Sequence, residues 1–203
     1  NPMPGPALLM VLIAMEFVVG LLIGTVARIF MTALDTAGMV ISLTSGLGNA
    51  QLFNPAFAAQ GSLIGAFLSV TGLVMLFVFN LHHILFYGLV GSYEMFPVGE
   101  VPNTGDMAQM VALTLASAFT IGIQLAAPFM VVAMLIYIGM GVLSRLMPQV
   151  QVFLLALPLQ IMLSLVTMSL VVSAMMMFWM TRFEEGMVFF LSSAGEGGME
   201  DTP

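Results

Sequence analysis

The sequence contains no cysteine and no lysine, and its only basic residues are Arg28, Arg145 and Arg182. Without cysteine, the chain can form no disulfide, no thiolate metal site and no cysteine nucleophile. Nucleic-acid binding requires a basic surface, and three arginines in a chain with a formal net charge of −7 do not supply one. We therefore expect no nucleic-acid partner.

Charge of either sign is scarce, because only 6% of the residues are charged while 61% are hydrophobic. Soluble domains carry about 25% charged residues. No Asp, Glu, Lys or Arg occurs in residues 36–81, 107–144 or 146–181. Since about 20 apolar residues cross a bilayer, each stretch can hold one or two membrane helices. The sequence predicts an all-α protein embedded in the lipid membrane, and three arginines are too few to predict its orientation.

Proline and glycine divide the apolar sequence into long helical segments. Helices are predicted over approximately 7–45, 56–90, 107–147 and 152–180. Pro128 is expected to kink or divide the third helix, and Pro158 lies near the start of the fourth. The pattern predicts long, kinked hydrophobic helices and helical hairpins.

Two polar stretches stand apart from these helices. Residues 91–105 are expected to form a loop in water or at the membrane interface. Residues 195–203 are acidic and rich in glycine, which is typical of a mobile tail. No separate soluble domain is visible, so we expect one membrane-embedded helical domain over residues 1–203.

The segment from Gly46 to Pro55 interrupts the apolar pattern with two glycines, two asparagines and a proline. Irregular backbone at membrane depth is tolerated only where protein buries it or where it lines a wet cavity. This segment is therefore a constriction or re-entrant loop in a pathway, or an ordinary loop that emerges at the membrane surface. Composition leaves both interpretations open.

Three ionisable residues, Glu16, Arg28 and Asp35, lie within the first apolar segment. Arg28 and Asp35 share a helix face but stand about 10 Å apart along its axis, too far for direct contact. Such groups in lipid indicate function by default. We favour the interpretation that they pair with neighbouring subunits or reach an interface.

Two pairs of glycines have the four-residue spacing that lets helices approach closely. They are Gly20 with Gly24 and Gly61 with Gly65. The 21 methionines allow two interpretations, a deformable gasket around a passing polypeptide or ordinary apolar packing. We favour packing for most of them.

No catalytic or metal-binding pattern accompanies the two histidines, His82 and His83. Adjacent helical residues point about 100° apart, so they cannot chelate one ion as residues four apart would. Neither a zinc-protease motif nor a nucleophile elbow nor a phosphate-binding loop is present. We expect no enzyme, metal or cofactor.

Four motifs stand in order along the chain: Glu16-Phe-Val-Val-Gly20 with Gly24, Gly46-Leu47 through Asn54-Pro55, Ser92-Tyr-Glu-Met-Phe-Pro97-Val-Gly99, and Arg145-Leu-Met-Pro148-Gln149 with Phe153 and Pro158-Leu159. Together they resemble the FliR family of flagellar export-gate proteins and its SpaR/YscT-type relatives in virulence secretion. The sequence departs from the family pattern at Asn54, where Asp is usual, and at Leu81, where Gly is usual. Family members carry further hydrophobic segments before the first motif, so we expect this chain to be incomplete at its N-terminus.

The resemblance implies a structural subunit that joins FliP- and FliQ-type subunits, and an FlhB-type export protein, in a multi-subunit helical assembly. This assembly would form the entrance of the channel for unfolded exported polypeptides, in the bacterial inner membrane at the flagellar basal body. The resemblance also implies that the loop at 46–60 is a plug, with Gly46, Leu47, Gly48, Asn49, Gln51, Phe53, Asn54 and Pro55. The assembly contacts we expect are Gly20, Gly24, Arg28, Gly61, Gly65, Arg145, Pro148 and Gln149.

Two other classes of protein are alternatives to an export-gate subunit. In a small-solute or ion transporter, the broken segment would be a substrate site between half-helices. The missing inverted repeat and the scarcity of charge count against it. An intramembrane enzyme is the third class, and no catalytic constellation supports it. The loop motifs favour the flagellar branch over the injectisome branch.

Overall fold

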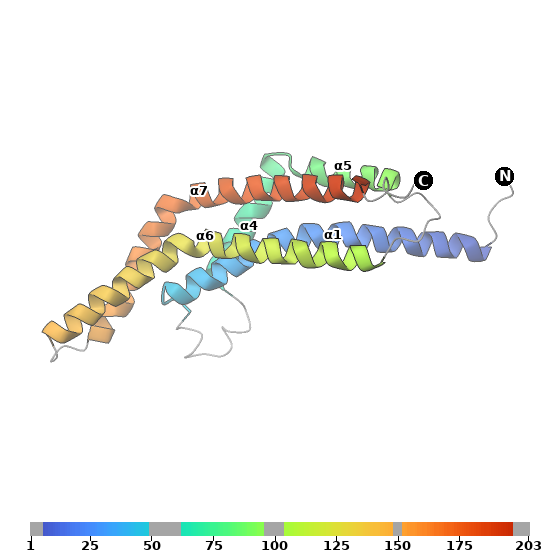
Figure 1. Ribbon diagram of the computed structural model, residues 1–203. Coiled ribbons are helices and arrows are strands. Elements are labelled where there is room, and N and C mark those ends of the chain that lie inside the picture. Colours follow the sequence, from blue (N-terminus) through green and yellow to red (C-terminus); the bar gives the residue numbers. More distant parts are fainter. Residues whose placement is uncertain (1–5, 49–61, 96–103, 148–151, 197–203) are drawn as a thin grey trace.

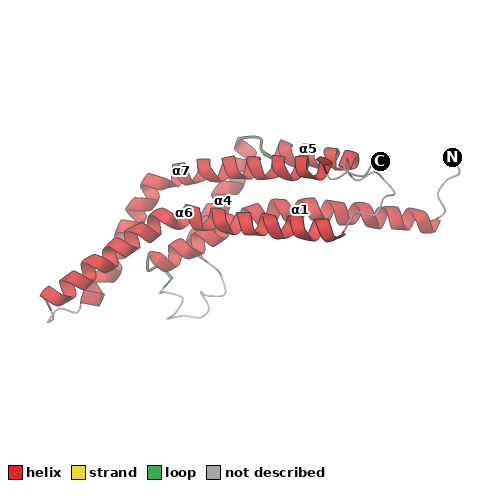
Figure 2. Cartoon of the chain, in the orientation of Figure 1, coloured by secondary structure: helices red, strands yellow, loops and turns green. Residues whose placement is uncertain are grey.

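The computed structural model describes residues 6–48, 62–95, 104–147 and 152–196, and all regular structure in these ranges is helical (Figure 2). The helices are α1 (Pro6–Thr44), α4 (Leu63–Val78), α5 (His82–Met95), α6 (Thr104–Leu146) and α7 (Val152–Glu196). Three helical segments are long and apolar enough to cross a membrane: Leu9–Thr44, Ala108–Leu146 and Ala156–Val188. The prediction of an all-helical protein with membrane-spanning helices is confirmed.

The helices form two elongated layers, as Figure 1 shows. Helix α1 lies beside α6 in one layer, α5 lies beside α7 in the other, and α4 runs between the layers. Helices α6 and α7 form an antiparallel hairpin whose closed end extends beyond the end of α1. The start of α1 and the end of α7 lie at the opposite end of the molecule.

The helix predicted over residues 56–90 is wrong as a single element. Helix α4 ends at Val78, and α5 begins at His82. Between them Asn80 has a φ of 60°, with hydrogen bonds from the Asn80 amide to Phe77 (3.2 Å) and from the Leu81 amide to Leu76 (3.0 Å). This is the Schellman ending of a helix, and asparagine is among the few residues that tolerate its left-handed position.

Two other predicted boundaries also differ. Helix α5 continues to Met95, so residues 91–95 of the predicted polar loop are helical. Helix α7 continues to Glu196, beyond the predicted end near residue 180. Helix α6 continues through Pro128 undivided, and Figure 1 shows it bending along its length, which agrees with the kink that was the other expectation. Side-chain polarity alone does not end a helix, because a polar residue keeps its backbone hydrogen bonds.

The described core is built around the middle of α1. Its side chains at Val26, Leu34, Ala37 and Ile41 are completely buried, at spacings that follow one face of a helix. Trp179 is also completely buried, and it reaches α1 from α7. Met175 and Met176 belong to this core, which supports the packing interpretation for them.

Helices α1 and α4 touch backbone to backbone where Gly38 meets Gly65. A Cβ atom added to Gly38 would lie 2.1 Å from the Cα of Gly65, so no larger residue fits without movement. Ser62 begins α4, accepts a hydrogen bond from the Gly65 amide at 3.1 Å and donates one to the Gly38 carbonyl at 2.9 Å. Gly65 thus allows the close approach of another helix that was predicted for it, because it has no side chain. The helix that approaches it is α1.

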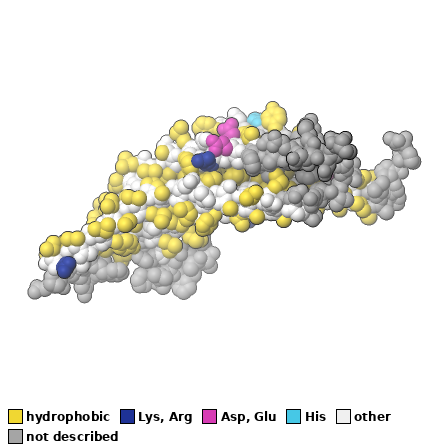
Figure 3. Space-filling view, in the orientation of Figure 1, with side chains coloured by type: hydrophobic (Ala, Val, Ile, Leu, Met, Phe, Trp, Pro, Cys, Tyr) yellow, Lys and Arg dark blue, Asp and Glu magenta, His cyan; other side chains and the backbone are white. Residues whose placement is uncertain are grey.

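The outer surface is largely apolar, as the space-filling view in Figure 3 shows for one face. Large hydrophobic side chains are exposed on every described helix, among them Phe17 at 68%, Leu63 at 81% and Leu170 at 76%. Contiguous apolar surface of this extent is incompatible with contact to water and requires lipid or partner subunits.

Candidate functional site at the end of helix α1

Helix α1 ends in a compact turn at residues 45–48, which we call the α1 turn. Gly46 has a φ of +78°, a left-handed conformation that favours glycine. The amide of Gly48 donates to the Ser42 carbonyl at 2.8 Å, which brings the chain back over the last helical turn. Ser45, Gly46 and Gly48 are buried. The irregular backbone at the end of this apolar helix is therefore covered by protein.

Helix α7 supplies the residue that covers the turn. The side chain of Gln160 is 4% exposed, and its Nε2 donates a hydrogen bond to the Thr44 carbonyl. The same nitrogen lies 3.5 Å from the Tyr137 hydroxyl oxygen on α6. A Cβ atom on Gly46 would lie 3.5 Å from Gln160 Oε1 and 3.6 Å from Leu157. One buried amide thus connects α1, α6 and α7.

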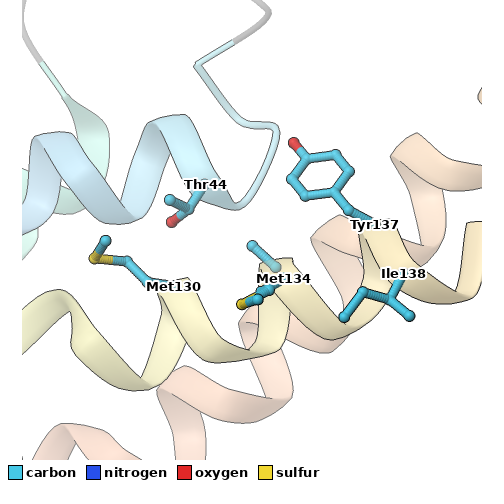
Figure 4. Close-up of a pocket in the computed structure, with 6 residues that line it drawn as sticks. Thr44, Met130, Met134, Tyr137 and Ile138 are labelled. Carbon is cyan, nitrogen blue, oxygen red and sulfur yellow. The ribbon is translucent and has the colours of Figure 1, made fainter. Parts of the chain in front are cut away.

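A shallow hollow of about 430 Å³ lies beside the α1 turn. Figure 4 shows Thr44 of α1 across from the α6 side chains that line the rest of it. The lining residues are Thr44, Met130, Ala133, Met134, Tyr137 and Ile138. Its wall is mostly apolar, with Thr44 and Tyr137 as the polar lining residues, so it offers apolar contact surface.

Only three of the predicted plug residues lie within the described ranges. Gly46, Leu47 and Gly48 form the α1 turn, whereas Asn49, Gln51, Phe53, Asn54 and Pro55 lie outside the described residues. Sequence reasoning missed Gln160 and Tyr137. The available signal was a glutamine within an apolar run, because polar side chains in membrane helices are costly unless they have a role.

The predicted assembly residues occupy different environments. Gly20, Gly24 and Arg28 are exposed on α1, and a Cβ atom at either glycine would meet nothing within 4 Å. Gly65 is buried against α1 of its own chain. Arg145 is exposed in the last turn of α6, where a cation favours the helix dipole. Gly61, Pro148 and Gln149 lie outside the described residues.

The ionisable residues of α1 have few partners in the described parts of the chain. Asp35 accepts a hydrogen bond of 2.5 Å from the Ser69 hydroxyl of α4. Arg28 and Asp35 do not pair with each other, and within the described ranges the one salt bridge is the exposed Arg182–Glu185 pair at 3.0 Å. Arg28 therefore presents its charge outward from an apolar helix.

The rings of His82 and His83 lie close together, with centroids 4.3 Å apart and planes tilted by 33°. These histidines are the first two residues of α5 and follow the Asn80 turn closely. His83 Nδ1 lies 3.2 Å from the Asn80 carbonyl. In the part of the chain that the structure describes, no group of three His, Cys, Asp or Glu side chains could hold a metal.

Long apolar helices, an apolar exterior and a buried turn define a helical membrane protein. Comparison with known proteins gives the family. Residues 1–186 match the model for "Bacterial export proteins, family 1". The chain is 37% identical over 170 residues to the "Flagellar biosynthetic protein FliR" of Caulobacter vibrioides, covering 84% of this chain and 68% of that protein.

Two further relatives are similar to this chain over most of its length. The chain is 32% identical over 160 residues to the "Flagellar biosynthetic protein FliR" of Bacillus subtilis, covering 77% of this chain and 62% of that protein. It is 32% identical over 154 residues to the "Yop proteins translocation protein T" of Yersinia pestis, covering 75% and 59%. The chain belongs to the FliR family, a non-enzymatic family of membrane proteins of flagellar and type III export.

Proposed function

We propose that this chain is a structural subunit of the flagellar-type export gate in the bacterial inner membrane, at the flagellar basal body. It would assemble with FliP- and FliQ-type subunits, contact an FlhB-type protein, and form the entrance of the channel for unfolded exported polypeptides. The observation that carries the proposal is the family match over residues 1–186.

The outer face of α1 supports assembly with other subunits. Gly20, Gly24 and Arg28 follow one another at four-residue intervals and so share one helix face. Both glycines are open to a neighbour, and small residues allow membrane helices to approach closely. An unpaired cation costs free energy in lipid. A partner helix that offers a carboxylate or hydroxyl to Arg28 would remove this cost.

We further propose that residues 46–60 form a plug in the channel. The burial of Gly46 beneath α7 and of Gly48 against the last turn of α1 supports this role for the first part of the segment. Backbone that leaves the helical pattern at membrane depth needs protein or a wet cavity around it. A turn pressed against its own α6–α7 hairpin meets that requirement.

Co-purification tests the assembly. The tagged full-length protein, co-expressed with the FliP- and FliQ-type proteins of the same bacterium, is solubilised in mild detergent and analysed by mass spectrometry. We expect both partners to be retained, and we expect Gly20→Leu with Gly24→Leu to release them. Gly139→Leu is the matched control, because this α6 glycine also has nothing within 4 Å of its Cβ position.

The contrary result is equally specific. A tagged protein that is recovered folded and monodisperse, without either partner, would contradict the proposal. If that protein alone also carried ions or small solutes across liposome membranes, the transporter interpretation would replace it.

A further inference from the structure

We propose that Gln160 is a positioning residue that fastens the end of α1 to α7 and thereby holds the α1 turn in its closed position. The hydrogen bond between Gln160 and the end of α1 lies within this chain and does not depend on the proposed function. Its effect on sealing of the export channel rests on the proposed function.

The chemistry of helix ends explains why this contact matters. The last four carbonyls of a helix have no partner within the helix and must find one elsewhere. Thr44 is the last residue of α1, and its carbonyl accepts its hydrogen bond from a side chain 116 positions away in the sequence. The α1 terminus is therefore capped by another helix and depends on where that helix lies.

The burial of Gln160 makes the contact costly to break. Its side chain is 4% exposed, and an amide without hydrogen-bond partners in apolar surroundings carries a large desolvation penalty. When α1 and α7 separate, the Gln160 amide and the Thr44 carbonyl lose the hydrogen bond between them. Tyr137 provides a second, longer contact at 3.5 Å.

Gly46 fits the same arrangement. A Cβ atom at Gly46 would lie in ordinary van der Waals contact with α7, 3.5 Å from Gln160 Oε1 and 3.6 Å from Leu157, so these side chains pack directly on the turn. The α6–α7 hairpin thus holds both the helix end and the residue that redirects the chain. A shift of this hairpin relative to α1 would release the turn.

The accessibility of an introduced cysteine reports the position of the turn, because residues 1–203 contain no cysteine of their own. Leu47→Cys places a single thiol in the half-buried centre of the turn. In the complete export complex in native membranes, its reaction rate with a membrane-impermeant maleimide is compared with and without Gln160→Met. We expect the rate to rise roughly three- to tenfold, the shift that one hydrogen bond can impose on an equilibrium.

Three further variants complete the test. Gln124→Met makes the same chemical change at an exposed glutamine of α6 and should leave the labelling rate unchanged. Tyr137→Phe removes the longer contact and should raise the rate less than Gln160→Met does. Gln160→Leu also removes the amide donor, with another apolar side chain. It gives the same expected rise if the methionine variant does not accumulate.

The outcomes separate the two proposals. Unchanged labelling in a Gln160 variant that still assembles would overturn the positioning role. Increased labelling with unchanged export and unchanged ion sealing would support the positioning role and contradict the plug. Increased labelling with ion leakage would support both.

Discussion

The indole nitrogen of Trp179 donates a hydrogen bond of 3.1 Å to the backbone carbonyl of Phe30. Both residues are buried, and the ring of Phe30 packs edge-on against Phe183 with centroids 5.8 Å apart. This contact joins the last helix to the first across the core. A polar side chain in an apolar core specifies one alignment of two helices, because every other alignment leaves its N–H without an acceptor.

Removal of this hydrogen bond should lower stability. For Trp179→Phe we expect the free energy of unfolding in detergent micelles to fall by about 1 to 3 kcal/mol, from the lost bond and the volume removed. Thermal or denaturant unfolding followed by circular dichroism measures this change. Tyr87→Phe, at a side chain that is 75% exposed, is the control for loss of a polar group and should change little. Equal stability of both variants would contradict the structural role of Trp179.

A methyl group at the α1–α4 contact should force the helices apart. Gly38→Ala would place its Cβ 2.1 Å from the backbone of Gly65, and we expect a cost of about 1 to 3 kcal/mol. Gly139→Ala is the control in open space, and a helical alanine there should gain up to about 1 kcal/mol. The same unfolding measurement compares the two variants, and their free energies of unfolding should change in opposite directions. A neutral Gly38→Ala would show that α4 does not pack on α1 in this way.

The α1 turn should be sensitive to any side chain at Gly46. Its φ of +78° costs other residues about 1 to 2 kcal/mol, and a bulky side chain would also displace Gln160. We expect Gly46→Leu and Gly48→Leu to cause leaky or failed export while membrane insertion survives. Secretion of a reporter substrate and ion leakage in cells measure this, with Gly141→Leu as the control in open space. Normal export with normal sealing would exclude the plug role.

The hydrogen bond from Ser69 to Asp35 should couple these residues energetically. We expect a double-mutant cycle of Ser69→Ala and Asp35→Leu to give about 1 kcal/mol of interaction energy, because the two groups are in contact at 2.5 Å. Asp35→Asn retains an oxygen acceptor and should preserve most of the coupling. Additive effects of the two substitutions would mean that the contact contributes nothing to stability.

Local features of the sequence predicted much of the described fold. The end of α1 followed from the glycines after Thr44, and the long apolar runs gave the spans of α1 and α6 within a few residues. The break at Asn80 was missed, since one asparagine is a weak signal inside an apolar run. The C-terminal extension of α7 was missed because its polar residues favour a loop without preventing a helix.

By itself the sequence determined the class of protein, because charge, hydropathy and helix-breaking residues act within a few turns of the chain. It also determined that Gly46 would end a helix and that Gly65 would allow a close approach. Only the tertiary structure decided the partners: Gly38 for Gly65, Phe30 for Trp179 and the end of α1 for Gln160. The last two contacts span 149 and 116 residues. No local pattern encodes them, because they depend on how whole helices align when they pack.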